Sequence, residues 1–542
     1  MARTPTRARA GKRRPLSPPQ PASWTIPAVV FCVMYAGLLL VIPSRLVVAQ
    51  IGAPGTPANL FGICGLILWL LMTVGGFNRQ GMTPMRVSFG LFALAVGTSY
   101  VAGHLAGWFQ PADIHQRTDR LWRWVSVSQL NEAIVSASDR GLLALAGGAG
   151  ILLLTAEGMR SWRDLELLTT WIVRFAGIVA ALGVLQYFTG VNVAAYLQVP
   201  GLSPLTELMT FSRSELNRVI STAGHPIELG VIMAALLPLA LHHSIFTRKA
   251  SAWAPTILIS VVVLMSVSRS AILVAAGAMI VMLLGWPNRW RIRFLVMMPF
   301  AAVAARLAFP GLLGTIRALF VHLDDDPSID GRTADYDFVF RAFQEAPLFG
   351  RGYFTWVPMY FRTLDNQFLV LLLELGLVGS FVFVGLIAIG VYSGFSCRSR
   401  TDERGSNLGL AVAAGIFGIA VSFATFDTLA FRQATGIMFL LLGMAGAAWS
   451  LARRDQLRRW QELLTRAIDR LAMGATLEHA VRPATAAHPP QQPDLITPPT
   501  RARPEDHNGK PDRPAVLTHP DQTLPTTKIN YATQPSPRLD SG

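Results

Sequence analysis

The chain of 542 residues is 52% hydrophobic and only 15% charged, with a mean hydropathy of +0.41. Soluble domains carry about 25% charged residues, so the composition excludes an ordinary soluble protein. The net charge of +15 does not indicate a nucleic-acid partner, because the basic residues lie at the ends of apolar runs and in the tails. The three cysteines have no metal-binding spacing and do not indicate a disulfide framework.

Apolar runs long enough to cross about 30 Å of hydrocarbon dominate the chain and predict a polytopic helical membrane protein. Residues 1–23, rich in Arg, Pro and Ala, are expected to form a disordered cytoplasmic tail, followed by an apolar run too long for a cleavable signal. About twelve spans follow: 25–48, 58–76, 86–107, 140–156, 167–189, 226–246, 253–267, 270–286, 293–309, 366–393, 408–425 and 430–450.

The distribution of basic residues predicts the orientation of these spans. With the N-terminus in the cytoplasm, every short inside loop is basic, as the positive-inside rule requires. These loops carry Arg79 and Arg86, Arg160 and Arg163, Arg248 and Lys249, Arg289, Arg291 and Arg293, and Arg398, Arg400 and Arg404.

Three long polar segments, 108–139, 190–225 and 310–365, then lie on the outer face. They could be mere connectors, but connectors between packed helices are usually short. We therefore expect an extracytoplasmic functional face, with the large loop 310–365 between the ninth and tenth spans.

Two of the spans are unusual. The stretch 254–285 is apolar except around Arg269, and neither half crosses comfortably alone, which predicts a helical hairpin with Arg269 at its outer tip. Span 366–393 carries Glu374 about two turns from its outer end. A carboxylate there is costly unless it is paired or lines a wet cavity.

The C-terminal part has two predicted regions. Residues 451–475 have helical apolar spacing with arginines on the other face, which predicts a cytoplasmic amphipathic helix lying on the inner leaflet. Residues 476–542 are rich in Pro, Thr, Ala and Gln and are expected to be disordered.

Arginine is the main cation of the outer segments. Guanidinium groups bind phosphate oxygens bidentately and stay charged near an apolar wall, so the cluster suggests an anionic lipid phosphate or diphosphate. Snorkelling to head groups or pairing with local acids is the alternative. The set is Arg213, Arg218, Arg269, Arg332, Arg341, Arg351 and Arg362.

Several other polar residues are candidates. His225, at the outer end of a span, is either a helix cap or a catalytic group, and Glu228 lies one turn further in. Residues 324–326 are three aspartates that could hold a divalent cation but read more simply as a solvated loop. Asp365-Asn366 begins a span, where an N-cap is expected. The same carboxylate could act as a general base on an acceptor hydroxyl.

Taken together, four motifs in order resemble the O-antigen ligase/O-antigen polymerase superfamily of bacterial membrane proteins. They are Arg218-Val-Ile-Ser-Thr-Ala-Gly-His225-Pro226, Ser266-Val-Ser-Arg269-Ser, Gly331-Arg332 through Gly350-Arg-Gly352, and Asp365-Asn366-Gln-Phe-Leu with Glu374-Leu-Gly376. The resemblance covers roughly residues 210–395, within a transmembrane domain of 24–450.

The resemblance implies a metal-independent, cofactor-free glycosyltransferase of the C-type membrane fold. It would take a glycan from an undecaprenyl-diphosphate-linked donor and transfer it, with inversion, to a glycan or lipid acceptor. Arg218 and Arg269 match positions expected to face the diphosphate. Many members have His-Asn where this chain has Asp365-Asn366, and often Asn where it has Ile227.

We therefore expect Asp365 and His225 to be the catalytic residues. The residues expected to bind the diphosphate or glycan are Arg218, Arg269, Arg332, Arg341, Asn366 and Glu374. The predicted location is the bacterial inner membrane with both termini cytoplasmic. Other polysaccharide assembly proteins are predicted as further partners. The alternatives are a secondary transporter or lipid-linked glycan flippase, or a non-catalytic scaffold.

Overall fold

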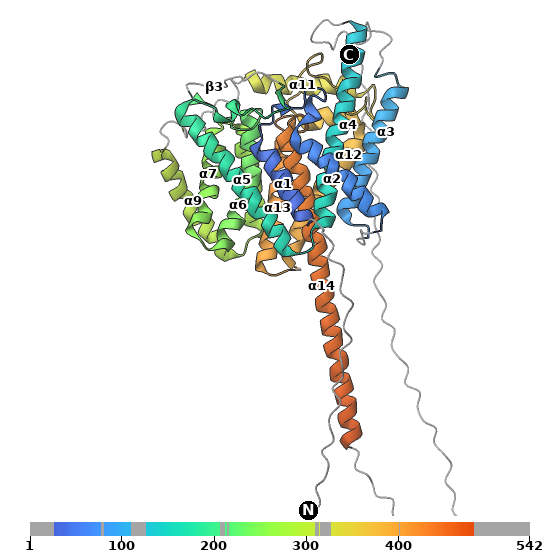
Figure 1. The fold of residues 1–542 in the computed structure, drawn as a ribbon, viewed down its shortest axis with the longest axis vertical. Helices are drawn as coiled ribbons and strands as arrows, with labels where there is room; N and C mark the ends of the chain where they lie inside the picture. Colours follow the sequence, from blue (N-terminus) through green and yellow to red (C-terminus); the bar gives the residue numbers. More distant parts are fainter. Residues whose placement is uncertain are drawn as a thin grey trace, which may run out of the picture. The chain divides into compact units, whose positions relative to one another are not determined.

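The computed structural model describes residues 27–76, 81–109, 126–205, 212–213, 216–308, 314, 327–399 and 401–481. The chain divides into two units, Met1–Leu471 and Ala472–Gly542, and the first contains a bundle of α-helices (Figure 1). The helices described are α1 (Ala28–Val41), α2 (Pro57–Val74), α3 (Pro84–Leu105), α4 (Val127–Gly158), α5 (Trp162–Thr189), α6 (Pro226–Thr247), α7 (Trp253–Met265), α8 (Arg269–Gly285), α9 (Asn288–Ala308), α11 (Pro327–Phe343), α12 (Gln367–Phe395), α13 (Glu403–Ser422) and α14 (Arg432–Val481).

Short elements connect these helices. Strand β1 (Leu46–Val47) pairs antiparallel with β2 (Ser203–Pro204), with Leu46 opposite Pro204, and so joins the segment after α1 to the segment before α6. Strands β3 (Ser212–Arg213) and β4 (Leu216–Asn217) form a second antiparallel pair. Single 3-10 turns occupy η1 (Ala53–Gly55), η3 (Val193–Tyr196), η4 (Ala250–Ala252), η5 (Ser396–Ser399) and η6 (Thr428–Ala430).

Each apolar run predicted from the sequence overlaps one helix of the bundle. Eight helices of the described part are long and apolar enough to cross a membrane, and three more are apolar but shorter. The fold is therefore that of a helical membrane protein, while the count of twelve spans stays a prediction. Helix α4 begins well before the predicted run, because a capping box between Ser126 and Gln129 starts it at Val127.

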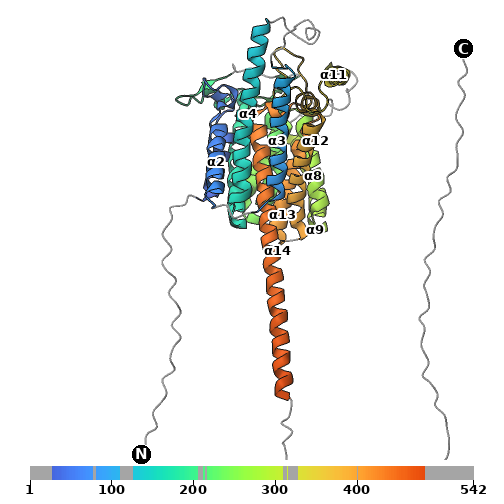
Figure 2. The same ribbon diagram turned by 90° about the vertical axis from the view of Figure 1, so that its right-hand side faces the viewer.

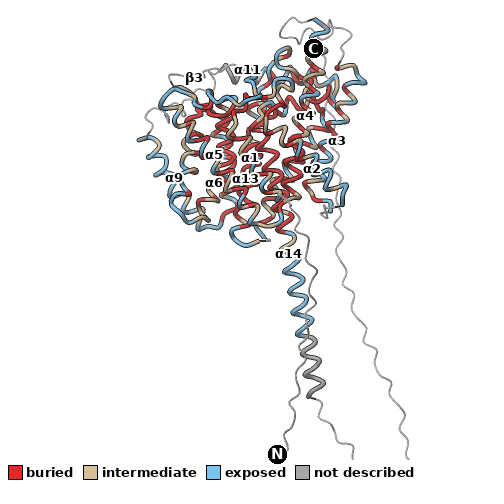
Figure 3. Tube along the Cα trace, in the orientation of Figure 1, coloured by how far each residue is buried: buried red, intermediate tan, exposed pale blue. Residues whose placement is uncertain are grey.

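Helix α6 lies at the centre of one half of the bundle. It packs against α5, α7, α8 and α13, and most of its side chains are buried (Figure 3). A helix that is apolar on every side has no face for water, which agrees with its position inside the bundle. The first turns of α6 are consequently held rigidly, and they carry His225 and Glu228.

The helical hairpin predicted around Arg269 is confirmed. Helices α7 and α8 have 13 and 17 residues. At 1.5 Å per residue they extend roughly 20 and 26 Å, each short of a 30 Å hydrocarbon layer. They flank α6, since α7 packs against α5 and α6 while α8 packs against α6 and α13. The turn between them contains Val267 at φ 45°, and Ser268 caps α8 by accepting from the Ala271 amide.

Helix α12 is interrupted at Gly376, whose φ is 65°. The segment Gly350-Arg-Gly352 lies in this interruption, where the Arg351 and Gly352 amides donate to the carbonyls of Leu373 and Glu374 at 2.9 and 3.0 Å. A Cβ atom at Gly376 would lie only 2.4 Å from the Leu348 carbonyl oxygen, so a larger residue cannot replace this glycine. Two of the sequence motifs thus interlock through their backbones.

The described part of the predicted outer loop, 327–365, packs on the bundle (Figure 2). Its apolar side chains form a cluster with the end of α3, the start of α4 and the start of α12. The buried members are Phe109, Leu130, Ile134, Val339, Ala342, Trp356, Phe361, Leu364, Leu369, Val370 and Leu373. We call the end of the helix bundle on which residues 327–365 pack the loop end.

Helix α14 differs from the prediction for the C-terminal segment. The sequence predicts a separate helix over 451–475 lying on the membrane surface, whereas α14 is one helix from Arg432 to Val481. The chain has no Gly or Pro between Gly446 and Gly474 to end it. Trp162 donates to Asp455 at 2.8 Å, and beyond that contact the helix is exposed through Arg470 (Figure 3). The segment therefore continues the last span away from the loop end.

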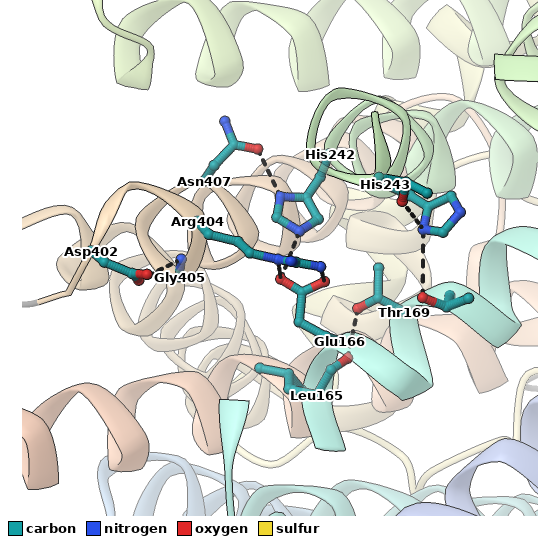
Figure 4. Close-up of polar contacts among 11 residues, drawn as sticks. Leu165, Glu166, Thr169, His242, His243, Asp402, Arg404, Gly405 and Asn407 are labelled. Carbon is teal, nitrogen blue, oxygen red and sulfur yellow. Dashed lines mark hydrogen bonds and ion pairs between the residues drawn. The ribbon is translucent and has the colours of Figure 1, made fainter. Parts of the chain in front are cut away.

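A polar network joins three helices at the end of the bundle opposite the loop end (Figure 4). Glu166 of α5 accepts two hydrogen bonds from Arg404 of α13, at 2.7 and 3.1 Å. The buried ring of His242 on α6 lies between Glu166, at 3.1 Å, and Asn407 of α13, at 2.8 Å. Since both imidazole nitrogens face oxygen atoms, the network fixes α6 between its two neighbours.

We predict that Glu166→Gln lowers the stability of the bundle. The substitution weakens charge-assisted bonds to Arg404 and His242, which are worth about 1.5–3 kcal/mol each, so a clear drop in the melting temperature is expected. Thermal unfolding of the purified protein measures it. Glu403→Gln is the control, because the Glu403–Arg289 ion pair is about half exposed and contributes roughly 0–1 kcal/mol. Equal melting temperatures for the two variants would contradict the structural role of the network.

Candidate functional site

The helices α6, α8, α12 and α14 all begin at the loop end. Two contacts join the starts of three of them: Glu228 of α6 accepts from the Gln433 amide of α14 at 2.8 Å, and the Gln367 side chain of α12 accepts from the amide of Leu429, just before α14, at 2.6 Å. Helix N-termini carry a partial positive charge and exposed amide donors. The four helix N-termini therefore make this end electropositive even without the arginines, which suits an anionic ligand.

At this end, Arg218 contacts the turn that leads to Arg269. The Arg218 Nε donates to the Ser266 carbonyl at 3.0 Å, and Ser266 begins the hairpin turn that leads to Arg269, the first residue of α8. Both side chains are half-buried. The contact brings the two cations predicted to face a diphosphate to one region, although they are 51 positions apart in the sequence.

His225 is the N-cap of α6, which agrees with the capping interpretation of this residue. Its Nδ1 accepts a hydrogen bond from the Ile227 amide at 3.1 Å, so Nδ1 carries no proton and Nε2 does. Burial, and then the charge of Arg218, lower the pKa of His225 to about 4, although Asp365 acts in the opposite direction. His225 is therefore a neutral hydrogen-bond donor at neutral pH, and neither of its ring nitrogens is available as a base.

Asp365 is exposed and lies directly before the N-cap of α12. The cap itself is Asn366, whose Oδ1 accepts from the amides of Phe368 and Leu369 at 3.0 and 3.4 Å. The capping role expected for the pair is thus carried by Asn366, which also contacts the Tyr336 hydroxyl at 3.3 Å. The Asp365 carboxylate is close enough to His225 to influence its titration and remains open to solvent.

Asp427 is a polar residue of this site that sequence reasoning missed. It lies between α13 and α14, and its charge interacts with that of Asp365. Burial, reinforced by the charge of Asp365, raises the pKa of Asp427 to about 7, against a hydrogen bond from the Ala430 amide. A carboxyl group that titrates near neutral pH beside an exposed carboxylate is a pattern of acid–base sites. In sequence, Asp427 stands in a short connector without any motif around it.

The remaining predicted residues have other surroundings. Glu374 is buried, and its carboxylate accepts from the Trp356 amide at 3.2 Å, so it holds the segment after Gly352. Arg341 is exposed on α11 and donates to the Asp337 carbonyl at 3.4 Å. The side chain of Arg332 and residues 324–326 lie outside the described part.

Two of the outer arginines pair with local acids, as the alternative interpretation expects. Arg351 binds Glu345 at 3.0 Å and stacks on Trp108 at 4.3 Å. Arg362 forms an ion pair with Asp335. Among the described residues, no group of three or more His, Cys, Asp or Glu side chains is arranged to hold a metal ion.

The fold and the candidate site define a multi-pass helical membrane protein with a group of polar and cationic residues at its loop end. Residues 254–384 match the family model described as O-Antigen ligase. This match runs from α7 into α12 and confirms the resemblance to the O-antigen ligase superfamily that the motifs indicate. The family implies glycosyltransferase-like processing of lipid-linked glycans at a membrane. No curated protein matches the chain.

The matched segment contains Arg269, Asp365 and Glu374, whereas Arg218 and His225 precede it and Asp427 follows it. The structure brings these outlying residues to the matched segment through the contacts described above. The site is therefore assembled from parts of the chain that the family model covers and parts that it does not.

We predict that Asp427→Asn stabilises the protein increasingly as the pH rises from about 4 to 7. The unfolded carboxyl ionises near 3.8, while the folded one resists ionisation up to about 7, so its contribution to stability is full below 3.8 and is lost through 7. The melting-temperature difference between variant and wild type, measured from pH 5 to 8.5, should grow and then level off. A difference independent of pH would contradict the raised pKa, and Asp337→Asn, at an exposed position, is the control.

Proposed function

We propose that the protein is an inverting, metal-independent membrane glycosyltransferase that transfers or polymerises a glycan from an undecaprenyl-diphosphate-linked donor. The loop end faces the extracytoplasmic side of a bacterial inner membrane, and both termini are cytoplasmic. The observation that carries the proposal is that the charges of both Arg218 and Asp365 act on His225. Arg218, a cation that can bind a phosphate, and Asp365, a carboxylate that can accept a hydroxyl proton, are thus both near His225.

In the reaction, the oxygen of an acceptor hydroxyl attacks the anomeric carbon of the donor glycan. Asp365 takes the hydroxyl proton, a new glycosidic bond forms, and the bond to the diphosphate oxygen breaks with its electron pair staying on the diphosphate. Negative charge grows on that leaving group. Arg218, Arg269 and the first amides of α8 stabilise this charge, and fixed donors of this kind are often the largest single contribution to catalysis.

His225 supports this assignment of roles. Its Nε2–H donates to an oxygen of the donor or acceptor, while its Nδ1 stays bound to α6. The alternative base is Asp427 rather than Glu374, because the Glu374 carboxylate is buried and engaged by backbone amides. Asp427 is only partly buried and interacts with the charge of Asp365.

The leaving-group role is tested at Arg269 and Arg218. Arg269→Ala and Arg218→Ala should each lower transfer from a lipid-linked oligosaccharide about 10²-fold or more. Arg269→Lys keeps the charge but loses the planar fork, so an intermediate loss is expected. Arg289→Ala, at the opposite end, is the control and should transfer normally. Normal rates in both loop-end alanine variants would leave lipid head-group snorkelling as the better explanation.

The base role is tested at Asp365. Since Asn366 caps α12, Asp365→Asn should leave folding intact while lowering transfer by about 10²–10⁴-fold, the usual cost of losing a general base. Asp365→His should restore part of the rate, with a pH dependence moved toward an imidazole pKa of about 6.5. The exposed Asp337→Asn is the matched control. Full activity of Asp365→Asn would transfer the base role to Asp427.

A further inference from the structure

We propose that a second site of the loop end, separate from the proposed catalytic groups, binds the phosphate head of an amphiphile. It is a cavity of about 210 Å³ between α1, α4 and the start of α14. Arg140 of α4 and Arg432 of α14 line it, whereas His225, Arg218, Arg269 and Asp365 do not. The inference does not depend on the glycosyltransferase proposal.

The two guanidinium groups of this cavity have unused donors. The Arg432 NH1 donates to the Ser44 carbonyl at 2.7 Å, but its Nε is buried without a hydrogen-bond partner. Arg140 forms no hydrogen bond or ion pair with any residue that the structure describes, and its guanidinium lies against Gly52. The unpaired Arg432 donor is buried and therefore costly, whereas Arg140 is exposed, so an acceptor-rich ligand that reaches Arg432 would be favourable.

Among the described residues, no acid forms an ion pair with Arg140 or Arg432. Glu228 interacts with the charge of Arg432, but its carboxylate is occupied by the backbone amides of Gly224, Gln433 and Ala434. No carboxylate lines the cavity. Two like charges at one low-dielectric wall favour an anion over a neutral ligand.

Two of the other polar side chains of the wall already form hydrogen bonds within the protein. Asn59 donates to the Pro54 carbonyl, and Thr435 donates to the carbonyls of Thr428 and Leu429. A sugar would need such hydroxyl and amide groups free, whereas a phosphate needs the arginines. The hydrogen-bond donors that remain on the arginines therefore favour a phosphate over a sugar.

The wall becomes apolar toward the middle of the bundle. Arg432 is the first residue of α14, and Phe439 lies two turns further along the same helix. On α4 the order from Arg140 is Ala144 and then Gly148. A head group at the arginines would thus continue into a slot for hydrocarbon. At about 210 Å³ the cavity is smaller than the ~300–1,000 Å³ typical of whole-ligand pockets, so it suits a head group with part of one chain.

The connection between α13 and α14 separates this cavity from the proposed catalytic groups. Leu429 and Ala430 line the cavity, while the ring of Phe431 lies 6.0 Å from the ring of His225. One short segment therefore borders both sites. An amphiphile in the cavity would rest against the connection that also carries Asp427.

The test uses the full-length protein carrying Arg218→Ala and Arg269→Ala, so that phosphate binding at the proposed catalytic site is weakened. It is released from phosphatidylcholine nanodiscs and titrated with dodecyl phosphate by native mass spectrometry. One dodecyl phosphate should bind per chain. Adding Arg140→Gln or Arg432→Gln should weaken binding roughly tenfold or more, the size expected for a bond to a charged group. Ala144→Leu, which fills the apolar part, should also weaken it, and Arg163→Gln is the control.

Dodecanol should bind much more weakly than dodecyl phosphate, and inorganic phosphate should compete only weakly. Unchanged affinity in Arg140→Gln and Ala144→Leu, which do not alter the Arg432 contact to Ser44, would overturn the site. Equal binding of dodecanol would overturn the phosphate preference, and equal binding of inorganic phosphate would overturn the role of the chain. The unmodified catalytic-site background, titrated in parallel, keeps the two sites distinguishable.

Discussion

The structure of the loop end depends on the hydrogen bonds that the buried carboxylate of Glu228 accepts. It accepts hydrogen bonds from Gly224 at 2.8 Å, from Gln433 at 2.8 Å and from Ala434 at 3.3 Å. One side chain therefore satisfies the first amides of α14 and the turn before α6. Without it, those amides would be unpaired donors in an apolar interior, each costing about 1–3 kcal/mol. The turn that it fixes carries His225, and the helix that it fixes begins with Arg432.

The contacts of Glu228 also help to position the charged groups of the proposed site. Arg218 reaches the hairpin turn through the Ser266 carbonyl, and the α8 N-terminus adds its own positive potential at Arg269. His225 has a lowered pKa because it is buried and beside Arg218, and its bond to the Ile227 amide fixes its tautomer. The carboxylates of Asp365 and Asp427 belong to the same proposed site, since the charge of Asp365 acts on both His225 and Asp427.

Much of this arrangement could be predicted from sequence. Hydropathy located the helices, and the apolar halves around Arg269, each short for a span, predicted the hairpin. The motifs pointed to the family. Sequence could not show that Asn366 rather than Asp365 caps α12, since both are good caps. It also missed Asp427, because burial and a neighbour 62 positions away raise its pKa, and neither leaves a local pattern.

The same reasoning explains the error at the C-terminus. The apolar spacing of 451–475 correctly predicted a helix, but the absence of a breaker after Gly446 makes it part of α14. Amphipathic spacing alone does not decide whether a helix turns onto a membrane surface. The contact of Asp455 with Trp162 instead continues the direction of the last span.

The most direct measurement of the account is a single turnover of the purified protein in proteoliposomes with an oligosaccharide on undecaprenyl diphosphate and a glycan acceptor. The account predicts that the acceptor gains the glycan with inverted anomeric configuration, that free undecaprenyl diphosphate is released in equal amount, and that a metal chelator has no effect. Movement of the intact lipid-linked oligosaccharide between leaflets without cleavage of the sugar–diphosphate bond would contradict it and would show a transporter instead.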